Sequence, residues 1–430
     1  MDISVVVIIL AVFAVCMLLS MPVAISMGWA ALVYFLMLPS YKFILMLPQG
    51  MFQGIDSFVL MAVPFFMLAG ELMNVCGLTD RLMHLAHVLA GNIRGSLAYA
   101  NMIASFLFAG ISGAAVSDVA ALGSIEIPAM KKQGYDAPFA AAITACSSLV
   151  GPIIPPSIIM VIYGSIMGVS IAGLFAAGIV PGLLFLFIDF GYVGWLAKRR
   201  NYPKRKTPSS LREIGKATWQ SSMALFLPVI IIGGILGGIF TPTEAAVVAV
   251  FYALALGVIY RKLDLHSLGK SMLTAGIKSS YIFLIIAVAI AFKWVLSILN
   301  IPTEVLNLLT SVSENKWVVI TLVNVFFIFI GMFFETGAAV ILFGPIFAPA
   351  MILLGFDPLH FGIIMIVNLC IGLCTPPLGV CLYAACSISG VRLEEISREA
   401  TPFILHYIVV LAIITYFPAV ALWLPRALGF

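Results

Sequence analysis

The sequence predicts an all-α polytopic membrane protein made of two inverted-topology repeats. About ten crossings, two of them broken helices, and two re-entrant hairpins are expected. Three observations predict this class: an apolar composition, a one-sided distribution of basic residues and an internal repeat. Of the 430 residues, 63% are hydrophobic and 9% are charged, and the mean hydropathy is +1.18. Because a soluble domain carries about 25% charged residues, this chain cannot cover a water-facing surface and belongs in a bilayer.

Apolar runs long enough to cross about 30 Å of hydrocarbon recur along the whole chain. The first run has no basic leader segment before it, and we expect it to be retained as a span. Uninterrupted spans are predicted at 3–19, 23–38, 57–76, 172–196, 223–239, 243–260, 280–299 and 403–424.

Four further apolar stretches are interrupted by glycine, proline or acidic residues. We interpret 97–128 and 317–354 as re-entrant hairpins, and 138–167 and 359–388 as broken crossings. Irregular backbone at membrane depth costs several kcal/mol per unsatisfied group unless protein or water covers it. Four such breaks therefore favour an internal polar site over simple proline kinks in a packed bundle.

Basic residues set the orientation, because cytoplasmic loops carry the excess of Lys and Arg. The segment 198–216 holds eight of the 22 basic residues and is placed in the cytoplasm. With hairpins and broken crossings as above, 18 basic residues are cytoplasmic and three are outside, while Lys293 lies within a span. Both termini are then periplasmic. Hairpins that cross twice would satisfy the charge distribution equally well, so that variant stays open.

The internal repeat appears when the chain is shifted by 221 residues against itself without a gap. Pro128-Ala129-Met130 then falls on Pro349-Ala350-Met351, and Pro155-Pro156 falls on Pro376-Pro377. Glycines and aspartates align in the same register. With the charge bias, the first hairpin opens to the cytoplasm and the second to the periplasm. Inverted repeats whose broken helices meet at mid-membrane are typical of secondary transporters.

The breaks offer oxygen ligands and helix N-termini. The first repeat has them in 110–118 and 151–157, and the second in 331–339 and 372–379. Freed carbonyls and hydroxyl groups suit a hard cation such as Na⁺, while half-helix N-termini attract an anion. Asp118 and Glu335 lie at or near the two hairpin tips, and an intramembrane acid indicates function. Each acid could ligate Na⁺, order its tip through backbone N–H groups, or bind a proton.

Four other charged groups are weaker candidates. Glu244 is expected to interact with the first turn of its own helix, while Glu71 and Glu126 lie at span ends. Lys293 could be a substrate counter-ion, although a lone lysine on an apolar helix more often snorkels or pairs with an acid. A continuous polar path, as in a channel, and a nucleophile–base pair, as in an enzyme, are not visible, so we do not expect an enzyme.

At these residues the chain resembles the large membrane subunit, the DctM type, of tripartite ATP-independent periplasmic (TRAP) transporters. The likeness rests on the segments around 112–136, 151–157, 226–246 and 370–379 and covers essentially the whole chain. The resemblance implies an elevator-type carrier driven by a Na⁺ gradient. It implies as partners a periplasmic solute-binding protein and a small four-helix membrane subunit, the latter expected as a separate chain.

The breaks and the resemblance together predict the site residues. The metal set is Ser112, Gly113, Asp118, Gly151, Pro155, Glu335, Gly372, Thr375 and Pro376, holding Na⁺ as two or more ions. The substrate set is Pro156, Ser157, Thr336, Gly337 and Pro377. One position departs from the family pattern: similar proteins often have a second serine where this chain has Ala114, so a ligand there would have to be a carbonyl.

The predicted organisation alternates scaffold and transport core. The scaffold segments are 1–96, 172–300 and 391–430, and the core repeats are 97–171 and 301–390. The predicted function is binding-protein-dependent, Na⁺-driven import of small organic acids, of the C4-dicarboxylate or sialic-acid type, across a bacterial inner membrane. A proton-coupled carrier, or a stand-alone organic-anion carrier without a binding protein, is the alternative.

Overall fold

The computed structural model describes residues 3–38, 41–204 and 210–430, and these residues form an all-helical protein. Within them, the one strand-like pairing is an isolated bridge between Arg94 and Lys204. The predicted all-α class is therefore confirmed for this part of the chain. The centre of the predicted basic cytoplasmic segment, residues 205–209, lies outside the described residues.

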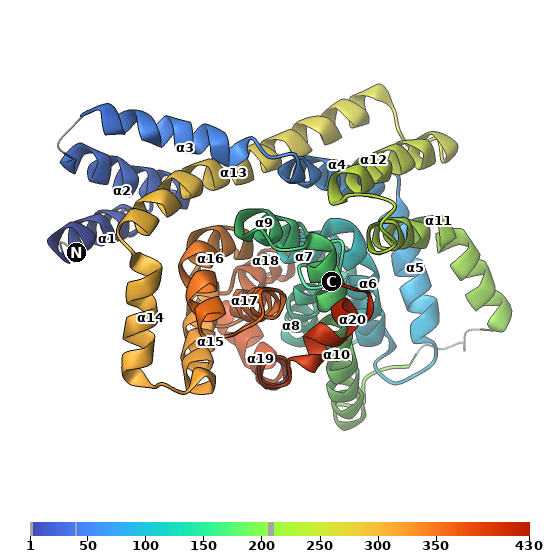
Figure 1. The fold of residues 1–430 in the computed structure, drawn as a ribbon. Coiled ribbons are helices and arrows are strands. Elements are labelled where there is room, and N and C mark those ends of the chain that lie inside the picture. The colour runs from blue at the N-terminus through green and yellow to red at the C-terminus, as the bar shows by residue number, and fades with distance from the viewer. Residues whose placement is uncertain (1–2, 39–40, 205–209) are drawn as a thin grey trace.

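One group of helices forms an outer frame. In Figure 1, α1–α4, α12 and α13 run along the top, α5 and α11 lie on the right, and α14 descends on the left. The helix α13 packs against α2, α3 and α4 and so ties this layer together. The frame helices are α1 (Ile3–Leu18), α2 (Val23–Met37), α3 (Met46–Ile55), α4 (Ala62–Val75), α5 (Leu78–Ala90), α11 (Leu211–Leu236), α12 (Pro242–Ile259), α13 (Leu265–Ile298) and α14 (Ile301–Val312).

The remaining helices form a core that the frame borders on three sides of the view (Figure 1). Its first half is α6 (Ser96–Ser112), α7 (Ala115–Lys132), α8 (Ala137–Ser147), α9 (Ile158–Met167) and α10 (Ile171–Arg199). Its second half is α15 (Lys316–Phe333), α16 (Thr336–Leu353), α17 (Pro358–Leu373), α18 (Val380–Ser389), α19 (Leu393–Tyr416) and α20 (Ala419–Ala427). Short 3-10 helices occur at Tyr41–Leu45, Val59–Met61 and Ser148–Val150.

Helix boundaries in the two core halves follow the register found in the sequence. Adding 221 to the bounds of α7 (115 and 132) gives 336 and 353, which are the bounds of α16. The starts of α8 and α17 differ by the same number, because 137 plus 221 is 358. Each half therefore contains a helical hairpin followed by a helix that is interrupted at the double proline. Both double prolines contain a cis peptide bond.

Local sequence explains where these helices begin. Pro358 stands at the first position of α17, where its missing N–H is not needed, and the Asp357 carboxylate accepts the N–H groups of Leu359 and His360. Thr241 and Glu244 form a reciprocal capping box at the start of α12. The expected first-turn role of Glu244 is thus confirmed.

Seven helices are long and apolar enough to cross a membrane within the described residues, and a bent pair would make eight. The bent pair joins 43–55 to 59–75 at an angle of 63°. Shorter apolar helices include α1, α2 and the pieces of the interrupted helices. The chain is therefore a multi-pass membrane protein, while the predicted total of ten crossings stays a prediction.

Two features of the predicted span list were wrong. The span 403–424 is split, because α19 ends at Tyr416 and α20 starts at Ala419. Pro418 lies between them, and a proline cannot donate the N–H that a continuous helix requires. Sequence reasoning also missed α3, α5 and α14, which are too short or too amphipathic to resemble a span.

The helices α10 and α19 pack mainly within the core. Each contacts α17, and they contact each other. The predicted division placed 172–300 and 391–430 in the scaffold, so most of α10 and all of α19 fall in predicted scaffold segments. The boundaries of that division stay a prediction.

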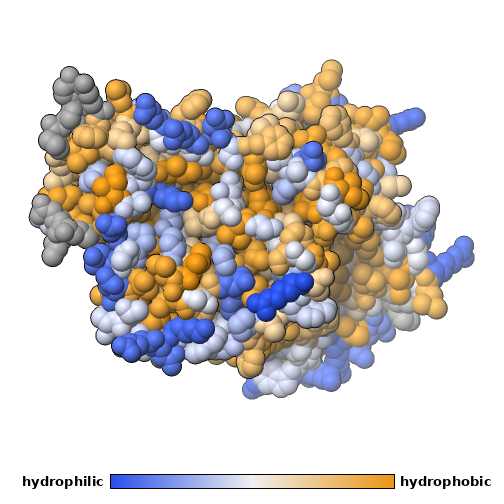
Figure 2. Space-filling view, in the orientation of Figure 1, coloured by the Kyte–Doolittle hydropathy of each residue, from blue (hydrophilic) through white to orange (hydrophobic). Residues whose placement is uncertain are grey.

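Large apolar side chains cover much of the outer surface. Figure 2 shows broad hydrophobic areas on the viewed face, with hydrophilic residues in smaller groups. Leu18 is 84% exposed, Trp219 80% and Ile239 71%. A water-soluble monomer rarely exposes apolar patches larger than a few hundred Å², whereas lipid accepts such a surface.

Candidate functional site

The first hairpin tip buries an acid. The helix α6 ends at Ser112, Gly113 takes the left-handed conformation (φ +60°), and α7 begins at Ala115. Asp118 follows in the first turn of α7 and is fully buried. Its Oδ1 accepts a hydrogen bond from the Ser112 hydroxyl, and its Oδ2 has no hydrogen-bond partner among the described residues. A buried carboxylate with one free oxygen strongly favours a nearby cation or a proton.

Gly151 brings the first break close to this acid. A methyl group added at Gly151 would lie 2.7 Å from Asp118 Oδ2 and 3.2 Å from the Ser148 carbonyl oxygen. The free carboxylate oxygen, the Ser112 hydroxyl and a carbonyl oxygen of the break therefore lie in one small region. These are hard oxygen donors, which suit Na⁺ and give no soft ligand for a transition metal.

Backbone contacts join the rest of the first break to the same tip. A methyl group on Gly113 would lie 3.1 Å from both the Pro156 carbonyl oxygen and the Ile158 nitrogen. Ser157 caps α9 by accepting the Met160 N–H, and its hydroxyl donates to the Pro152 carbonyl at 2.6 Å. The Ser157 hydroxyl thus holds the break in shape, while Pro155 and Pro156 are buried beside it.

The second tip presents its acid differently. Glu335 is the N-cap of α16, and its Oε2 accepts the Ala338 N–H at 3.1 Å. Its side chain is exposed to a cavity rather than buried. Thr336 is buried, and its hydroxyl has no hydrogen-bond partner among the described residues. The sequence left three roles open for this acid. The contacts of Glu335 fit one of them, which is to order the hairpin tip by accepting backbone N–H groups.

The second break meets its tip through backbone atoms. A methyl group on Gly372 would lie 2.4 Å from Gly331, so α15 and α17 touch at these two glycines. The Gly379 N–H donates to the Met332 carbonyl at 3.3 Å. Thr375 donates its hydroxyl to the Ile371 carbonyl at 2.7 Å, inside its own helix turn. Pro376 is half-buried and Pro377 is exposed.

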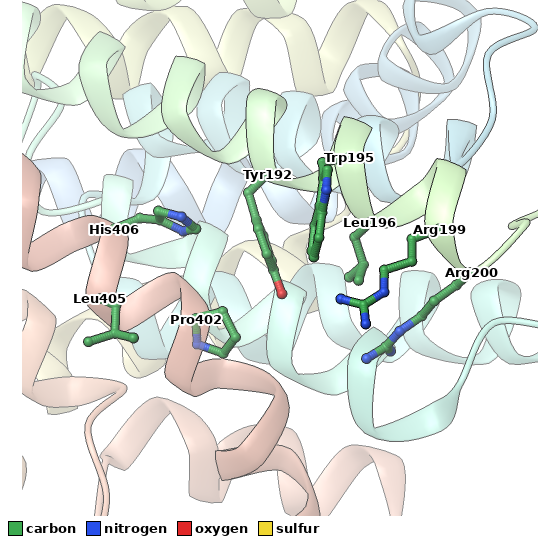
Figure 3. A pocket seen from close by; sticks show the side chains of 8 residues that line it. All are labelled: Tyr192, Trp195, Leu196, Arg199, Arg200, Pro402, Leu405 and His406. Carbon is green, nitrogen blue, oxygen red and sulfur yellow. The ribbon is translucent and has the colours of Figure 1, made fainter.

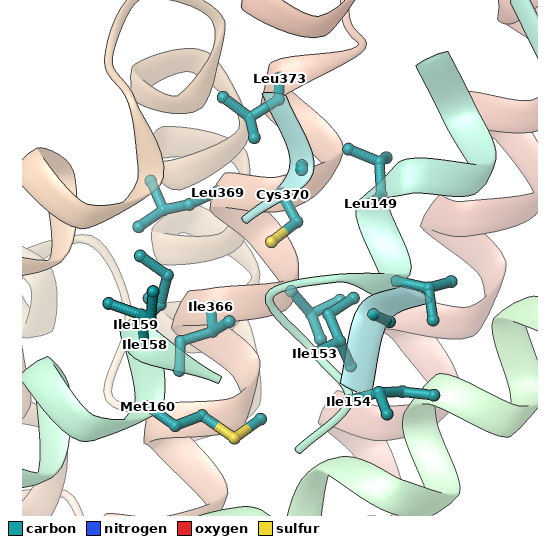
Figure 4. Packing of buried hydrophobic residues seen from close by; sticks show 14 of the residues in the cluster. Leu149, Ile153, Ile154, Ile158, Ile159, Met160, Ile366, Leu369, Cys370 and Leu373 are labelled. Carbon is teal, nitrogen blue, oxygen red and sulfur yellow. The ribbon is translucent and has the colours of Figure 1, made fainter. Parts of the chain in front are cut away.

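The first break and the end of α17 meet at the centre of the core. Cys374 Sγ donates to the Ala145 carbonyl oxygen at 3.2 Å, which links the end of α17 to α8. Figure 4 shows Leu149 of the 3-10 helix Ser148–Val150, and Ile153 and Ile154 of the first break, near Leu369, Cys370 and Leu373 of α17. All of these side chains are buried, with at most 8% exposed. The core can therefore hold both breaks as one rigid unit.

A cavity of about 760 Å³ lies where both tips face the frame. Gly113 and Ala114 contribute the first tip, Glu335 and Gly337 the second, and Ile158 the start of α9. The frame wall comes from the α1–α2 connection, α4 and α13. This volume matches the range of small-molecule sites. Of the predicted substrate residues, Gly337 lines the cavity, Pro156, Ser157 and Thr336 lie buried behind its wall, and Pro377 is exposed elsewhere.

Lys278 was missed as a site residue. It belongs to α13, lines the cavity and forms an ion pair with Glu71 of α4, with Nζ 2.6 Å from Oε1. The sequence places Lys278 just before an apolar run, where it reads as one more cytoplasmic charge. Only the packing of α13 against α4 shows that it faces the two tips.

Other charged candidates link the frame to the core. Lys293 of α13 donates to the Ile166 carbonyl oxygen in the last turn of α9 at 3.3 Å, so among the described residues it does not pair with an acid. Glu126 of α7 is buried and lies 2.8 Å from His87 Nε2 of α5. Neither group lines the cavity described above.

Comparisons with known proteins agree with this architecture. Residues 10–420 match the family described as the tripartite ATP-independent periplasmic transporter, DctM component. Over 410 residues the chain is 38% identical to the sialic acid TRAP transporter large permease protein SiaM of Vibrio cholerae, covering 94% of this chain and 95% of that protein. Over 380 residues it is 39% identical to the C4-dicarboxylate TRAP transporter large permease protein DctM of Pseudomonas aeruginosa, covering 88% and 89%.

The fold also resembles that of a solved transporter. The crystal structure of the Alcanivorax borkumensis YdaH transporter matches with a TM-score of 0.66, covering 92% of this chain and 91% of that one, at 14% identity. Identity this low supports a shared fold and nothing more. The apolar helices define a multi-pass membrane protein, and the family match and the relatives identify it as a transporter and not an enzyme. The chain belongs to the DctM component family of TRAP transporters.

Proposed function

We propose that this chain is the translocating subunit of a Na⁺-driven, binding-protein-dependent importer of small organic acids in a bacterial inner membrane. One observation carries the proposal: the cavity that both hairpin tips share with the frame, with the free oxygen of Asp118 close behind the first tip. A substrate in this cavity would contact residues of both repeats. The coupling ion would lie within the core that carries it.

Na⁺ fits the donor set of the first tip. Asp118 supplies the negative charge, Ser112 a hydroxyl, and the break at Gly151 brings backbone carbonyls. A second Na⁺ is proposed at the second tip and break, between Glu335 and the segment from Gly372 to Pro376. Binding there orders each tip against its break. Two ions moving with a monoanion carry one net charge, worth about 2.3 kcal/mol per 100 mV of membrane potential.

Movement of the core against the frame would provide alternating access. In the predicted inverted orientation the two hairpins open to opposite sides of the membrane and their tips meet at the shared cavity, an arrangement typical of secondary transporters. Polar contacts across the boundary include Lys293 with Ile166 and His87 with Glu126. Much of the remaining contact is apolar, and apolar surfaces slide without leaving unpaired polar groups.

The substrate class follows from the relatives. Large permeases named for sialic acid and for C4-dicarboxylates align over most of this chain. Both substrates are carboxylic acids, and the cavity lining includes Lys278, whose charge a substrate would share with Glu71, and the N-terminus of α16, where Glu335 already accepts one N–H group. As partners we propose a periplasmic solute-binding protein and a small four-helix membrane subunit, in keeping with the word tripartite in the family description.

Reconstitution into liposomes tests this function. The chain with its small subunit and cognate binding protein should take up a radiolabelled organic acid under an inward Na⁺ gradient, and an inside-negative potential should accelerate uptake. Omitting the binding protein or replacing Na⁺ with K⁺ is the matched control, and either change should abolish concentrative uptake. Uptake driven equally well by a proton gradient without Na⁺ would favour the proton-coupled alternative. Uptake by this chain alone would contradict the tripartite assembly.

A further inference from the structure

A second concave site lies on the core, away from the two tips. It is a groove of about 590 Å³ between the last turns of α10 and the middle of α19. Figure 3 shows Tyr192, Trp195, Leu196 and the two arginines on the α10 side, with Pro402, Leu405 and His406 on the α19 side. None of these residues belongs to the site described above.

The groove has apolar walls and a polar end at the two arginines, and His406 adds an imidazole on the α19 side. Leu196, Pro402 and Leu405 supply aliphatic walls, and the half-exposed Trp195 indole supplies an aromatic one. In Figure 3 the Tyr192 hydroxyl and the Arg199 guanidinium lie at the same end of the groove. A ligand that fits must therefore combine an apolar body with an anionic group.

The two arginines differ in how their charges are balanced. Arg200 is paired with Glu399 at 2.9 Å and Asp136 at 3.3 Å. Arg199 contacts the Trp195 ring, with its guanidinium carbon 5.1 Å from the ring centroid, and has no acidic partner among the described residues. Arg199 therefore leaves one unbalanced positive charge at the polar end of the groove.

The position of the groove along α10 matches a membrane interface. Arg199 and Arg200 end the longest core helix, at the start of the basic segment that the charge bias places in the cytoplasm. Tyr192 and Trp195 lie one to two turns before them, at the depth where aromatic residues gather near lipid headgroups. Basic pockets between transmembrane helices on the cytoplasmic side bind anionic headgroups.

We propose that this groove binds one anionic phospholipid of the cytoplasmic leaflet. Its phosphate contacts Arg199 and the Tyr192 hydroxyl, and an acyl chain lies along Trp195, Leu196 and Leu405. Charge complementarity selects this occupant, because an apolar helix of a partner protein would leave the Arg199 charge without a counter-ion. A lipid held here is attached to the core and not to the frame.

Lipid binding to the purified full chain tests the proposal. Native mass spectrometry with titrated phosphatidylglycerol or phosphatidylcholine should show clear preference for the anionic lipid. Arg199→Gln should weaken phosphatidylglycerol binding about fivefold, the usual contribution of one basic residue near an anionic surface, and should leave phosphatidylcholine binding unchanged. Arg392→Gln is the matched control, since Arg392 is 81% exposed and already paired with Glu395.

Several results would overturn the proposal. Equal binding of the two lipids, or unchanged phosphatidylglycerol binding in a folded Arg199→Gln protein, would mean ordinary annular lipid. Displacement by inorganic phosphate would mean a headgroup-only site, and protection of Arg199 by a copurifying membrane subunit would mean a protein interface. Thermal unfolding of each variant checks that the protein remains folded. Because the experiment measures lipid binding, its result does not depend on whether the proposed transport activity is observed.

Discussion

The two hairpin tips occupy equivalent places in the repeat but differ in chemistry. Asp118 is buried in the first tip and leaves one carboxylate oxygen without a partner. Glu335 faces the cavity in the second tip and caps its own helix. In the 221-residue register, Asp118 corresponds to Ala339 and Glu335 to Ala114, so neither acid has an acidic counterpart. The two halves of the repeat therefore share the backbone of the site but differ in where they place an acid and in what that acid contacts.

The breaks behind the tips differ in the same way. Gly151 and Gly372 are equivalent, because 151 plus 221 is 372. Gly151 faces a carboxylate side chain, whereas Gly372 faces the backbone of Gly331. The first break therefore leaves space for a ligand beside an acid. At the second break, α15 and α17 pack directly against each other. If Na⁺ binds as proposed, we expect the first tip to contribute more to its affinity and the second tip more to the shape of the cavity.

The largest effect is expected from Gly372→Ala. Its new methyl group would lie 2.4 Å from the Gly331 backbone, and backbone cannot rotate away, so α15 and α17 must separate. Overpacking of this kind costs about 1–3 kcal/mol or more. The melting temperature of the purified protein should fall by several degrees. Gly344→Ala is the control, because its nearest neighbour is the end of the flexible Met167 side chain at 3.6 Å. Equal stability of the two variants would contradict the proposed close contact.

Asp118→Asn should have the next largest effect. The change removes the charge but keeps the shape, so the Na⁺ concentration for half-maximal uptake should rise at least about tenfold, as expected for loss of a charged contact. Uptake at graded Na⁺ measures it. Asp189→Asn is a matched control: Asp189 is also a buried carboxylate with one oxygen bonded, to Tyr407 at 2.8 Å, and the other without a partner among the described residues, but it lies in α10 and not at a hairpin tip. An equal shift in both variants would indicate a general effect of losing a buried charge.

Gly151→Ala should act on the same ion site more weakly. Its methyl group would lie 2.7 Å from Asp118 Oδ2, and a carboxylate can turn away at moderate cost. We expect a rise of about threefold to tenfold in half-maximal Na⁺, equivalent to about 1 kcal/mol, with little loss of stability. Gly123→Ala, on the same helix α7 as Asp118 but facing Ile388 and Thr144 side chains at 3.3–3.4 Å, should leave Na⁺ activation unchanged. If Gly151→Ala failed to fold, Gly151 and Gly372 would both be required for packing, and the proposed difference between the two breaks would be wrong.

The backbone of the site could be predicted from the sequence, but the difference between its halves could not. Glycine, proline and the 221-residue register located the hairpin ends and both breaks, because those residues restrict backbone conformation wherever they stand. The direction of a side chain depends on packing between distant segments. The sequence therefore showed Asp118 and Glu335 as similar acids at two tips, and only the fold separates a buried carboxylate from one that faces a cavity.

The residues on the frame side of the cavity also could not be predicted from the sequence. Lys278 has the composition and position of a cytoplasmic loop charge, yet α13 continues unbroken from Leu265 to Ile298 and brings it beside the tips. Helices such as α5 and α14 carry too few apolar residues for a span. Their place is set by contacts with α6 and α16, which no local pattern encodes.

Glu335→Gln should have the smallest effect of the series on Na⁺ activation. The glutamine oxygen can still accept the Ala338 N–H, so the cap of α16 is largely retained, and the lost charge faces a cavity where a Lys278 side chain and solvent moderate it. We expect half-maximal Na⁺ to rise about twofold to threefold, well below the shift in Asp118→Asn. Glu335→Ala separates the two roles: it removes the cap as well, and should lower stability by about 1 kcal/mol beyond any change in Na⁺ activation.

If Glu335→Gln instead raised half-maximal Na⁺ as much as Asp118→Asn, the two tips would share ion binding equally. The burial of one acid and the exposure of the other would then reflect a single conformation and not a division of labour.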